Sequence, residues 1–150
     1  MKKISLQITA LLLFFIAAIS LATHSFAQSA PSIGGYSPVA YFTENQALKG
    51  DPGYTATHED RLYYFRNAEE LAMFNADPEK YVPRFPVCAY SLTLGKRMPI
   101  DPTNFQVVED HLLLFHRSEE LDGLALFEES ELTDAELLER ADREFRLLEF

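Results

Sequence analysis

The residues best suited to chemistry gather around the single cysteine of the chain. Cys88 lies in the stretch FPVCAYSLTLGKRMP (85–99), with Tyr90 two residues on and Lys96 further downstream. A cysteine thiolate is a nucleophile and also a soft metal ligand. Nucleophilic catalysis needs a base within hydrogen-bond reach and a third group that orients it, and the sequence names no such pair. We therefore assign no catalytic residue, and the sequence favours a non-enzymatic protein over a thiol- or tyrosine-assisted enzyme.

Metal binding is the second chemistry open to Cys88. The ion expected at a soft thiolate is copper or zinc, with help from a histidine or methionine, and Cys88 is the one metal ligand that we assign. Tight structural zinc sites use four ligands at short spacings, which this chain lacks. The remaining candidates are scattered along the chain: Met98, His58, His111 and His116. A packed, unreactive thiol stays open as the simpler interpretation.

An internal repeat indicates how these residues are positioned. The segment EDRLYYFRNAEEL (59–71) matches EDHLLLFHRSEEL (109–121) at an offset of fifty residues, and Tyr41 falls on Tyr90 at an offset of forty-nine. Matches in the same order along both halves are typical of a duplicated supersecondary unit. The sequence predicts that each unit contains a strand, a loop with an Asp-Pro pair, a hairpin and a helix.

Alternating and continuous apolar patterns predict the two hairpins. Their strands are 54–58 with 61–65, and 105–108 with 111–115. Neither connecting turn contains the glycine that two-residue hairpins prefer, so Asp60 and Asp110 must adopt a left-handed conformation.

Three helices are predicted from their caps and apolar spacing. The first has Asn67 as N-cap and stops before Pro78, and the second begins near Ser118. The third opens on the capping box from Thr133 to Glu136. Its apolar stripe consists of Leu137, Leu138, Ala141, Phe145 and Leu148.

These elements predict an α+β fold. Two repeated hairpin-helix units, about 36–85 and 86–150, form a small, mainly antiparallel sheet packed with helices, and the C-terminal helix covers the remaining apolar surface. The length of 36–150 fits a single domain, and 28–35 is predicted to be a flexible leader.

The first 27 residues read as a secretory signal peptide. Lys2 and Lys3 precede an apolar run, and Ser25 to Ala27 supplies a small-x-small cleavage site. We expect a periplasmic or secreted protein without a stable membrane anchor after cleavage. The net charge of −10 argues against a nucleic-acid partner and leaves a cation, a neutral ligand or a basic protein.

Four segments together resemble the exported bacterial YHS-domain proteins. They are GGYSPVAYF (34–42), RLYYFRNAEELAMFNADPEKYVPRF (61–85), CAYSLTLGKRMPIDP (88–102) and FQVVEDHLLLF (105–115). The resemblance implies a fold like that of cysteine-rich metal-sensing modules, and a role in metal handling. The chain departs from the family pattern at 85–87, where the family tends to show Gly-Gly-Tyr before its Cys-Ala pair.

The repeat suggests where a ligand would bind. If the two units pack about a pseudo-two-fold axis, Tyr41 and Tyr90 approach a shared cleft with Cys88 beside them and Lys96 at its rim. We therefore predict a small exported binding domain that holds a metal ion or small ligand near Cys88. The alternative is an acidic interaction or accessory module, whose C-terminal helices bind a basic protein without any small ligand.

Overall fold

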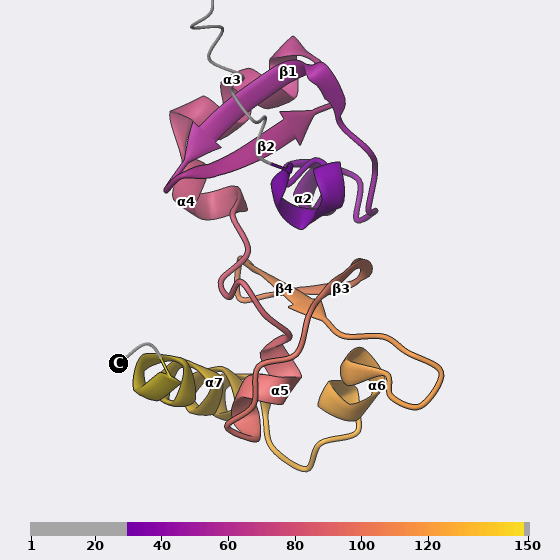
Figure 1. Ribbon diagram of the computed structural model, residues 1–150. Coiled ribbons are helices and arrows are strands. Elements are labelled where there is room, and N and C mark those ends of the chain that lie inside the picture. The colour runs from indigo at the N-terminus through magenta and orange to yellow at the C-terminus, as the bar shows by residue number, and fades with distance from the viewer. Residues whose placement is uncertain (1–29, 149–150) are drawn as a thin grey trace, which may run out of the picture.

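A computed structural model describes residues 30–148 of the chain (Figure 1). The predicted signal peptide, 1–27, lies outside the described residues, as do the first two residues of the predicted leader. Within the described part, no helix is both long enough and apolar enough to cross a membrane.

The first unit surrounds one hairpin with short helices. Its strands β1 (Asp51–His58) and β2 (Arg61–Phe65) are antiparallel. The helices of this unit are the 3-10 turn η1 (Ser32–Gly35), α2 (Ala40–Thr43), α3 (Ala68–Ala76) and α4 (Pro78–Tyr81). Most of the predicted leader that is described thus forms η1, which contacts β2 and buries Ile33.

The second unit repeats this plan and adds a longer helix. Its strands β3 (Asp101–Val108) and β4 (His111–Phe115) form the other antiparallel pair. Its helices are α5 (Ala89–Thr93), α6 (Gly123–Glu128) and the C-terminal α7 (Asp134–Leu148), which packs on α5. The predicted α+β class and the two hairpin-helix units are confirmed.

The two hairpins have the same register, which supports the repeat that the sequence indicates. Asp51 pairs with Phe65 and Asp101 pairs with Phe115, and each first strand has an irregularity just after its Asp-Pro pair. Both turns adopt the predicted left-handed backbone, with φ of 59° at Asp60 and 61° at Asp110. The duplicated sequence therefore specifies a duplicated backbone.

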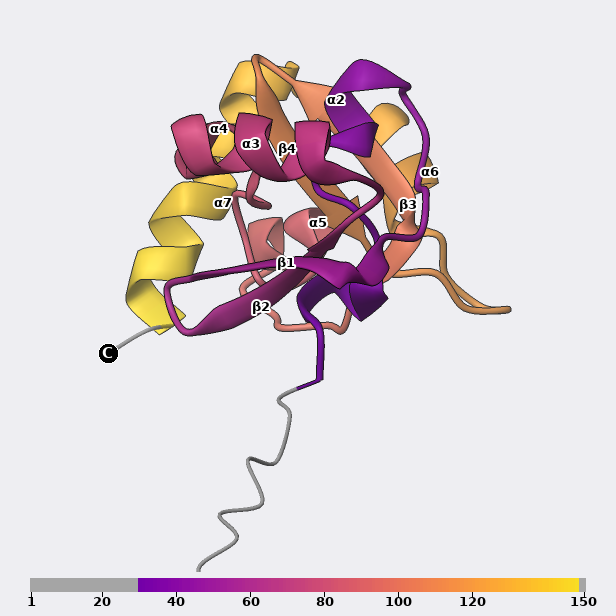
Figure 2. The ribbon, with the colours of Figure 1, turned by 90° about the horizontal axis from the view of Figure 1, so that it is seen from above.

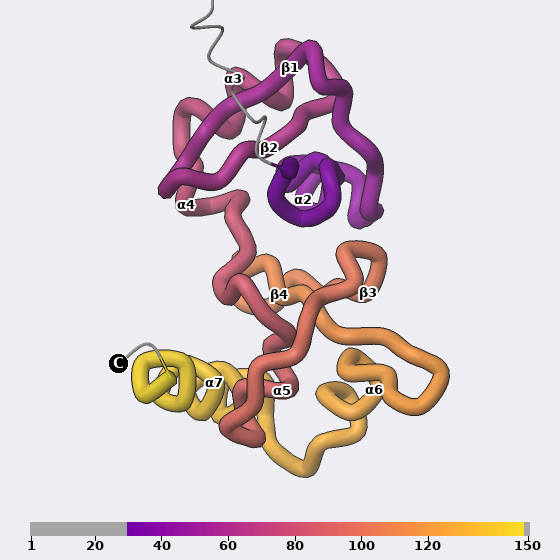
Figure 3. Tube along the Cα trace, in the orientation of Figure 1, coloured from indigo at the N-terminus to yellow at the C-terminus, as the bar shows by residue number. Residues whose placement is uncertain are grey.

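The hairpins remain two separate two-stranded sheets. The free edge of β4 is occupied by the chain that connects the units, because the amide of Arg84 donates to the carbonyl of Leu112 at 3.0 Å. Figure 3 shows this connection running from α4 down to α5. A backbone partner on each side of β4 explains why β1 and β2 do not extend its sheet.

The β3–β4 hairpin forms a middle layer between the first unit and the helices α5, α6 and α7 (Figure 1). Along β4 the side chains alternate between two cores, as successive residues of a strand must. Leu112 and Leu114 join the core of the first unit, whereas Leu113 and Phe115 join the core beneath α5 and α7. Seen from above, the first unit overlies the second (Figure 2).

Two of the three predicted helix starts are confirmed, each with its predicted cap. Asn67 Oδ1 accepts from the amide of Glu70 at 2.9 Å, and α3 ends before Pro78 as predicted. Thr133 and Glu136 form the predicted capping box at the start of α7. The stripe of α7 is also confirmed, since Leu137, Leu138 and Ala141 are buried.

Three local predictions were wrong. The strand predicted ahead of the Asp-Pro pair in each unit is absent from the described residues there, and a short helix precedes the pair instead, α2 in one unit and α5 in the other. The Asp-Pro pairs themselves begin β1 and β3 and do not lie in loops. The helix predicted near Ser118 begins five residues later at Gly123. Asp122 caps it through the amides of Leu124 and Ala125, and a carboxylate cap stabilises a helix start more strongly than an uncapped run of glutamates.

Candidate functional site

The sulfur of Cys88 is sealed inside the core of the second unit. The residue has no exposed surface and packs with Leu92, Leu113 and Phe115. Gly123 closes the remaining side, because a Cβ atom there would lie only 3.0 Å from the sulfur. The backbone is fixed too, with the amide of Cys88 donating to the carbonyl of Met98 at 2.9 Å. In this arrangement the thiol has no contact with solvent.

Tyr41 is a buried link between the two units. Its hydroxyl donates to the carbonyl of Pro102 at 2.9 Å, and its ring packs against Phe105 with centroids 4.7 Å apart. Burial raises the pKa of Tyr41, and the neighbouring Tyr36 and Asp101 add to the rise. The neutral hydroxyl therefore serves as a structural donor that ties α2 to the start of β3.

The four residues predicted to share a cleft do not meet in one. Tyr41 belongs to the core of the first unit, whereas Tyr90 is half-buried against the core that contains Cys88. Lys96 is exposed and lines a shallow hollow beside α7, formed with Thr93, Leu94, Gly95, Arg140 and Glu144. The helix α5 points its apolar side at the second core, so the pseudo-equivalent tyrosines face different layers.

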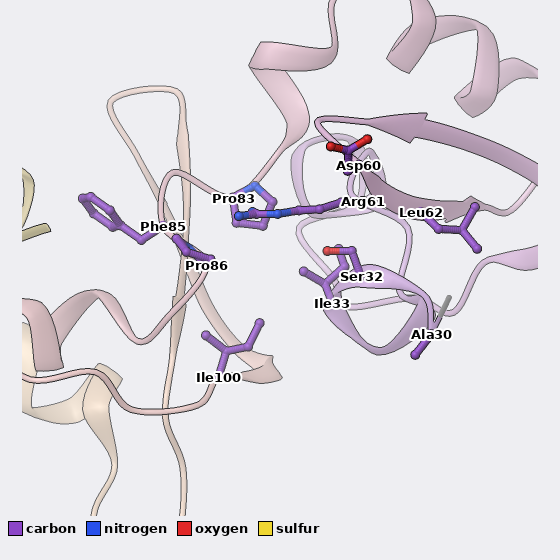
Figure 4. Close-up of a pocket in the computed structure, with 10 residues that line it drawn as sticks. All are labelled: Ala30, Ser32, Ile33, Asp60, Arg61, Leu62, Pro83, Phe85, Pro86 and Ile100. Carbon is purple, nitrogen blue, oxygen red and sulfur yellow. The ribbon is translucent and has the colours of Figure 1, made fainter. Parts of the chain in front are cut away.

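A cavity of about 310 Å³ does lie where the two units meet, and we call it the junction cavity (Figure 4). It draws residues from η1, from the start of β2, from the connection between the units and from the segment before β3. They are Ala30, Ser32, Ile33, Asp60, Arg61, Leu62, Pro83, Phe85, Pro86 and Ile100. Figure 4 shows the side chain of Arg61 extended past Pro83, with Ser32 below it.

A second cavity of about 520 Å³ shares the wall formed by Arg61, Pro83 and Pro86, and we call it the outer groove. It is more polar than the junction cavity. Its other lining residues are Glu59, Glu79, Val82, Arg84, His111 and Phe145. Arg84 is held by two hydrogen bonds to Asp142 of α7, at 3.1 and 2.7 Å. These bonds raise the pKa of Arg84 and leave its charge balanced.

Two polar networks serve structure instead of a ligand. The buried carboxylate of Glu70 accepts from Ser37 Oγ at 2.7 Å and from the amide and side chain of Arg66. In the second unit, Asp122 accepts from Asn104 Nδ2 at 2.9 Å. This bond, with others from Arg117 and the amides that Asp122 caps, holds the pKa of Asp122 at about 2. Both carboxylates are saturated with donors from their own unit.

Arg61 differs from Arg66, Arg84 and Arg117, each of which forms a salt bridge. Among residues 30–148, no salt bridge includes Arg61. Sequence reasoning missed this residue because it looks like an ordinary charged end of a strand. The prolines at 83 and 86 were the available signal, since they stiffen the connection between the two copies and keep the cavity wall in place.

Comparison of the chain with family models, with curated proteins and with solved structures found no match. The resemblance to the exported YHS-domain proteins stays a prediction from the motifs of this sequence.

Proposed function

We propose that this chain is a small, non-enzymatic binding domain whose ligand occupies the junction cavity. One observation carries the proposal: a partly open hollow between the two units, with more apolar than polar lining, is bordered by Arg61, whose guanidinium has no salt bridge among the described residues. Concave apolar sites with a few well-placed polar groups are the usual form of small-molecule sites. Because Cys88 is fully buried, we no longer expect the ligand to bind at its thiol.

The lining of the cavity indicates the chemistry of the ligand. Ile33, Leu62, Phe85 and Ile100 offer apolar surface to a short hydrocarbon portion. The guanidinium of Arg61 matches a carboxylate, which it binds through two parallel hydrogen bonds. Ser32 adds a hydroxyl that donates or accepts. A small amphipathic carboxylate therefore fits this cavity better than a cation or a sugar.

The compartment and family belong to the same proposal. Export through the segment 1–27 would place the domain in the periplasm or outside the cell. Membership of the YHS family would account for the order of motifs from Gly34 to Phe115. Neither is needed for the cavity to bind its ligand.

The proposal is tested by calorimetric titration of the purified protein with hexanoate, and with hexylamine and hexanol as probes of equal length. We expect hexanoate to bind most tightly. Arg61→Gln removes a charge-assisted hydrogen bond of about 1.5–3 kcal/mol, which corresponds to about a ten- to hundredfold loss of affinity. Lys96→Gln is the matched control, because Lys96 is an exposed cation outside the cavity. Equal affinities for the three probes, or an unchanged affinity in Arg61→Gln, would contradict the proposal.

A second function is favoured by one surface feature. The segment 128–139 exposes a run of carboxylates without any lysine or arginine between them: Glu128, Glu129, Glu131, Asp134, Glu136 and Glu139. Such a surface attracts a basic protein at low ionic strength. Crosslinking that recovers one basic partner, lost when salt is raised to 0.5 M, would support an interaction module; recovery that is insensitive to salt would oppose it.

A further inference from the structure

Three side chains at the tip of the first hairpin form a cluster of metal-ligand type. His58 ends β1, Glu59 lies in the turn and Glu79 lies in α4. One potential ligand atom from each lies within 4.8 Å of the other two. The cluster combines an imidazole with two carboxylates, so it differs from a simple group of surface acids.

The imidazole is held in place before any ion arrives. The ring of His58 contacts the buried ring of Phe74 edge to face, with centroids 6.2 Å apart. Its Nε2 atom lies 2.9 Å from Oε1 of Glu79. The side chain of His58 is only 23 % exposed, whereas that of Glu79 is 73 % exposed. A packed imidazole and an exposed carboxylate can approach one ion with little rearrangement of the backbone.

The cluster also faces an accessible polar space. Glu59 and Glu79 line the outer groove, and His111 of the second unit lines the same groove. A cavity of this size admits water, so an ion held by the three side chains can complete its coordination with solvent. The position is remote from Cys88, which lies in the other core.

We propose that His58, Glu59 and Glu79 form a site for a divalent cation of the zinc class. Imidazole suits Zn²⁺ but not Ca²⁺ or Mg²⁺, and carboxylates do not select Cu(I). Three protein ligands and a water complete the four-coordinate geometry that zinc adopts in open sites. This inference goes beyond the proposed function, because it uses a different cavity and no residue that contacts the amphipathic ligand.

Binding replaces the contact between His58 and Glu79 with two bonds to the ion. The lone pair of Nε2 must point at the metal, so the ring proton has to sit on Nδ1 in the bound state. No proton is released when the neutral ring merely changes its tautomer, whereas a charged ring loses one proton to solvent. The change of tautomer gives a signature that a simple hydrogen bond with Glu79 does not produce.

The test is a titration of the purified protein with Zn²⁺ against a competing chelator at pH 7.5. We expect one ion per chain, and His58→Gln and Glu79→Gln should each weaken binding at least about tenfold, since even outer-shell partners of metal ligands are worth that much. His116→Gln is the matched control, because His116 lies outside the cluster, with its Nδ1 3.0 Å from the carbonyl of Pro99. Cys88→Ala should bind zinc as the wild type does.

A spectroscopic measurement on the unaltered protein keeps the test independent of folding defects. The ¹⁵N signal of His58 Nε2 should shift on adding Zn²⁺, with the proton found on Nδ1. An absence of zinc binding, an unshifted His58 signal, or equal affinities in wild type and His58→Gln would overturn the proposal. Hexanoate binding by Arg61 would survive any of these results, so the two proposals fail separately.

Discussion

At the scale of single residues, the candidate chemistry lies away from the cysteine. Cys88 combines complete burial with a close approach by Gly123, so its sulfur behaves as a small apolar group. Arg61 has the opposite character, because its charge borders two cavities. Residue type alone ranks the thiol first. The burial of Cys88 and the accessible position of Arg61 place Arg61 ahead of the thiol as a candidate for binding a ligand.

Tyr41 gives a residue-scale prediction with a definite pH dependence. Tyr41→Phe removes the hydrogen bond to Pro102 and should lower the free energy of unfolding by about 1 kcal/mol at pH 7. Burial raises the folded pKa of Tyr41 above its ordinary value of 10.0. The wild type therefore keeps this stability in full below about pH 10 and loses it as the pH rises further, because the unfolded state ionises first.

The measurement is denaturant unfolding of wild type and Tyr41→Phe between pH 7 and pH 11. The difference between the two proteins should shrink above pH 10, since the phenylalanine variant lacks the ionising group. A difference that stays constant up to pH 11 would contradict the assignment of Tyr41 as a buried donor.

At the scale of elements, the repeated units are built from the same hairpin and differ in what covers it. The second unit is covered by α7, whose buried Leu137 and Leu138 lie about one helical turn before the buried Ala141, on the side of the helix that packs on α5. Its opposite face carries charges and leaves Leu147 exposed. The apolar packing of the helix therefore rests on one narrow stripe, beside the salt bridge of Asp142 with Arg84.

This stripe leads to a prediction about the stability of the second unit. Leu137→Ala should lower the free energy of unfolding by about 2–5 kcal/mol, through lost apolar burial and the cavity left behind. Leu147→Ala makes the same chemical change at a site that is 66 % exposed, and it should change stability by less than about 0.5 kcal/mol. Similar losses in both variants, measured by urea unfolding, would show that α7 does not pack by this stripe.

Caps and hairpins could be predicted from the sequence because their signals are local. Asn67 and Thr133 act within three residues of their own position, and the turns at Asp60 and Asp110 follow from the spacing of their strands. The predictions that were wrong concern segments whose conformation depends on contacts distant in the sequence. Nothing near Ala89 indicates that α5 must turn its apolar side to α7, and apolar residues in such short segments fit a strand or a helix equally well.

The site was less predictable than the fold for the same reason. The repeat suggested that a ligand would lie between the copies, but it could not say which residues border that space. The equivalence of Tyr41 and Tyr90 in sequence did not bring them together, because β3 and β4 lie between their two cores. Arg61 borders the cavity only because the connection between the units, with Pro83 and Pro86, runs opposite it.

At the scale of the whole molecule, β4 joins the two halves. Leu112 contributes to the first core and its neighbour Leu113 to the second, and both are fully buried. Loss of either core would expose one face of the same strand. The two units should therefore unfold together, although their sequences derive from one repeat.

Substitutions on the two faces of β4 test this coupling. Leu112→Ala and Leu113→Ala should each lower the free energy of unfolding by about 2–5 kcal/mol and shift one common transition. Calorimetry checks the result, because the calorimetric and van't Hoff enthalpies agree when the halves unfold as one. Two transitions, of which each variant shifts a different one, would mean that the units are independent.

The most direct measurement of the central claim is an NMR map of the protein during titration with hexanoate. The account predicts that the largest shifts come from the methyl groups of Ile33, Leu62 and Ile100 and from the guanidinium of Arg61, all of which line the junction cavity. Leu92 and Leu113, which pack around Cys88, should move little. Shifts centred on Leu92 and Leu113, with Arg61 unaffected, would contradict the account and would indicate that the ligand binds near Cys88.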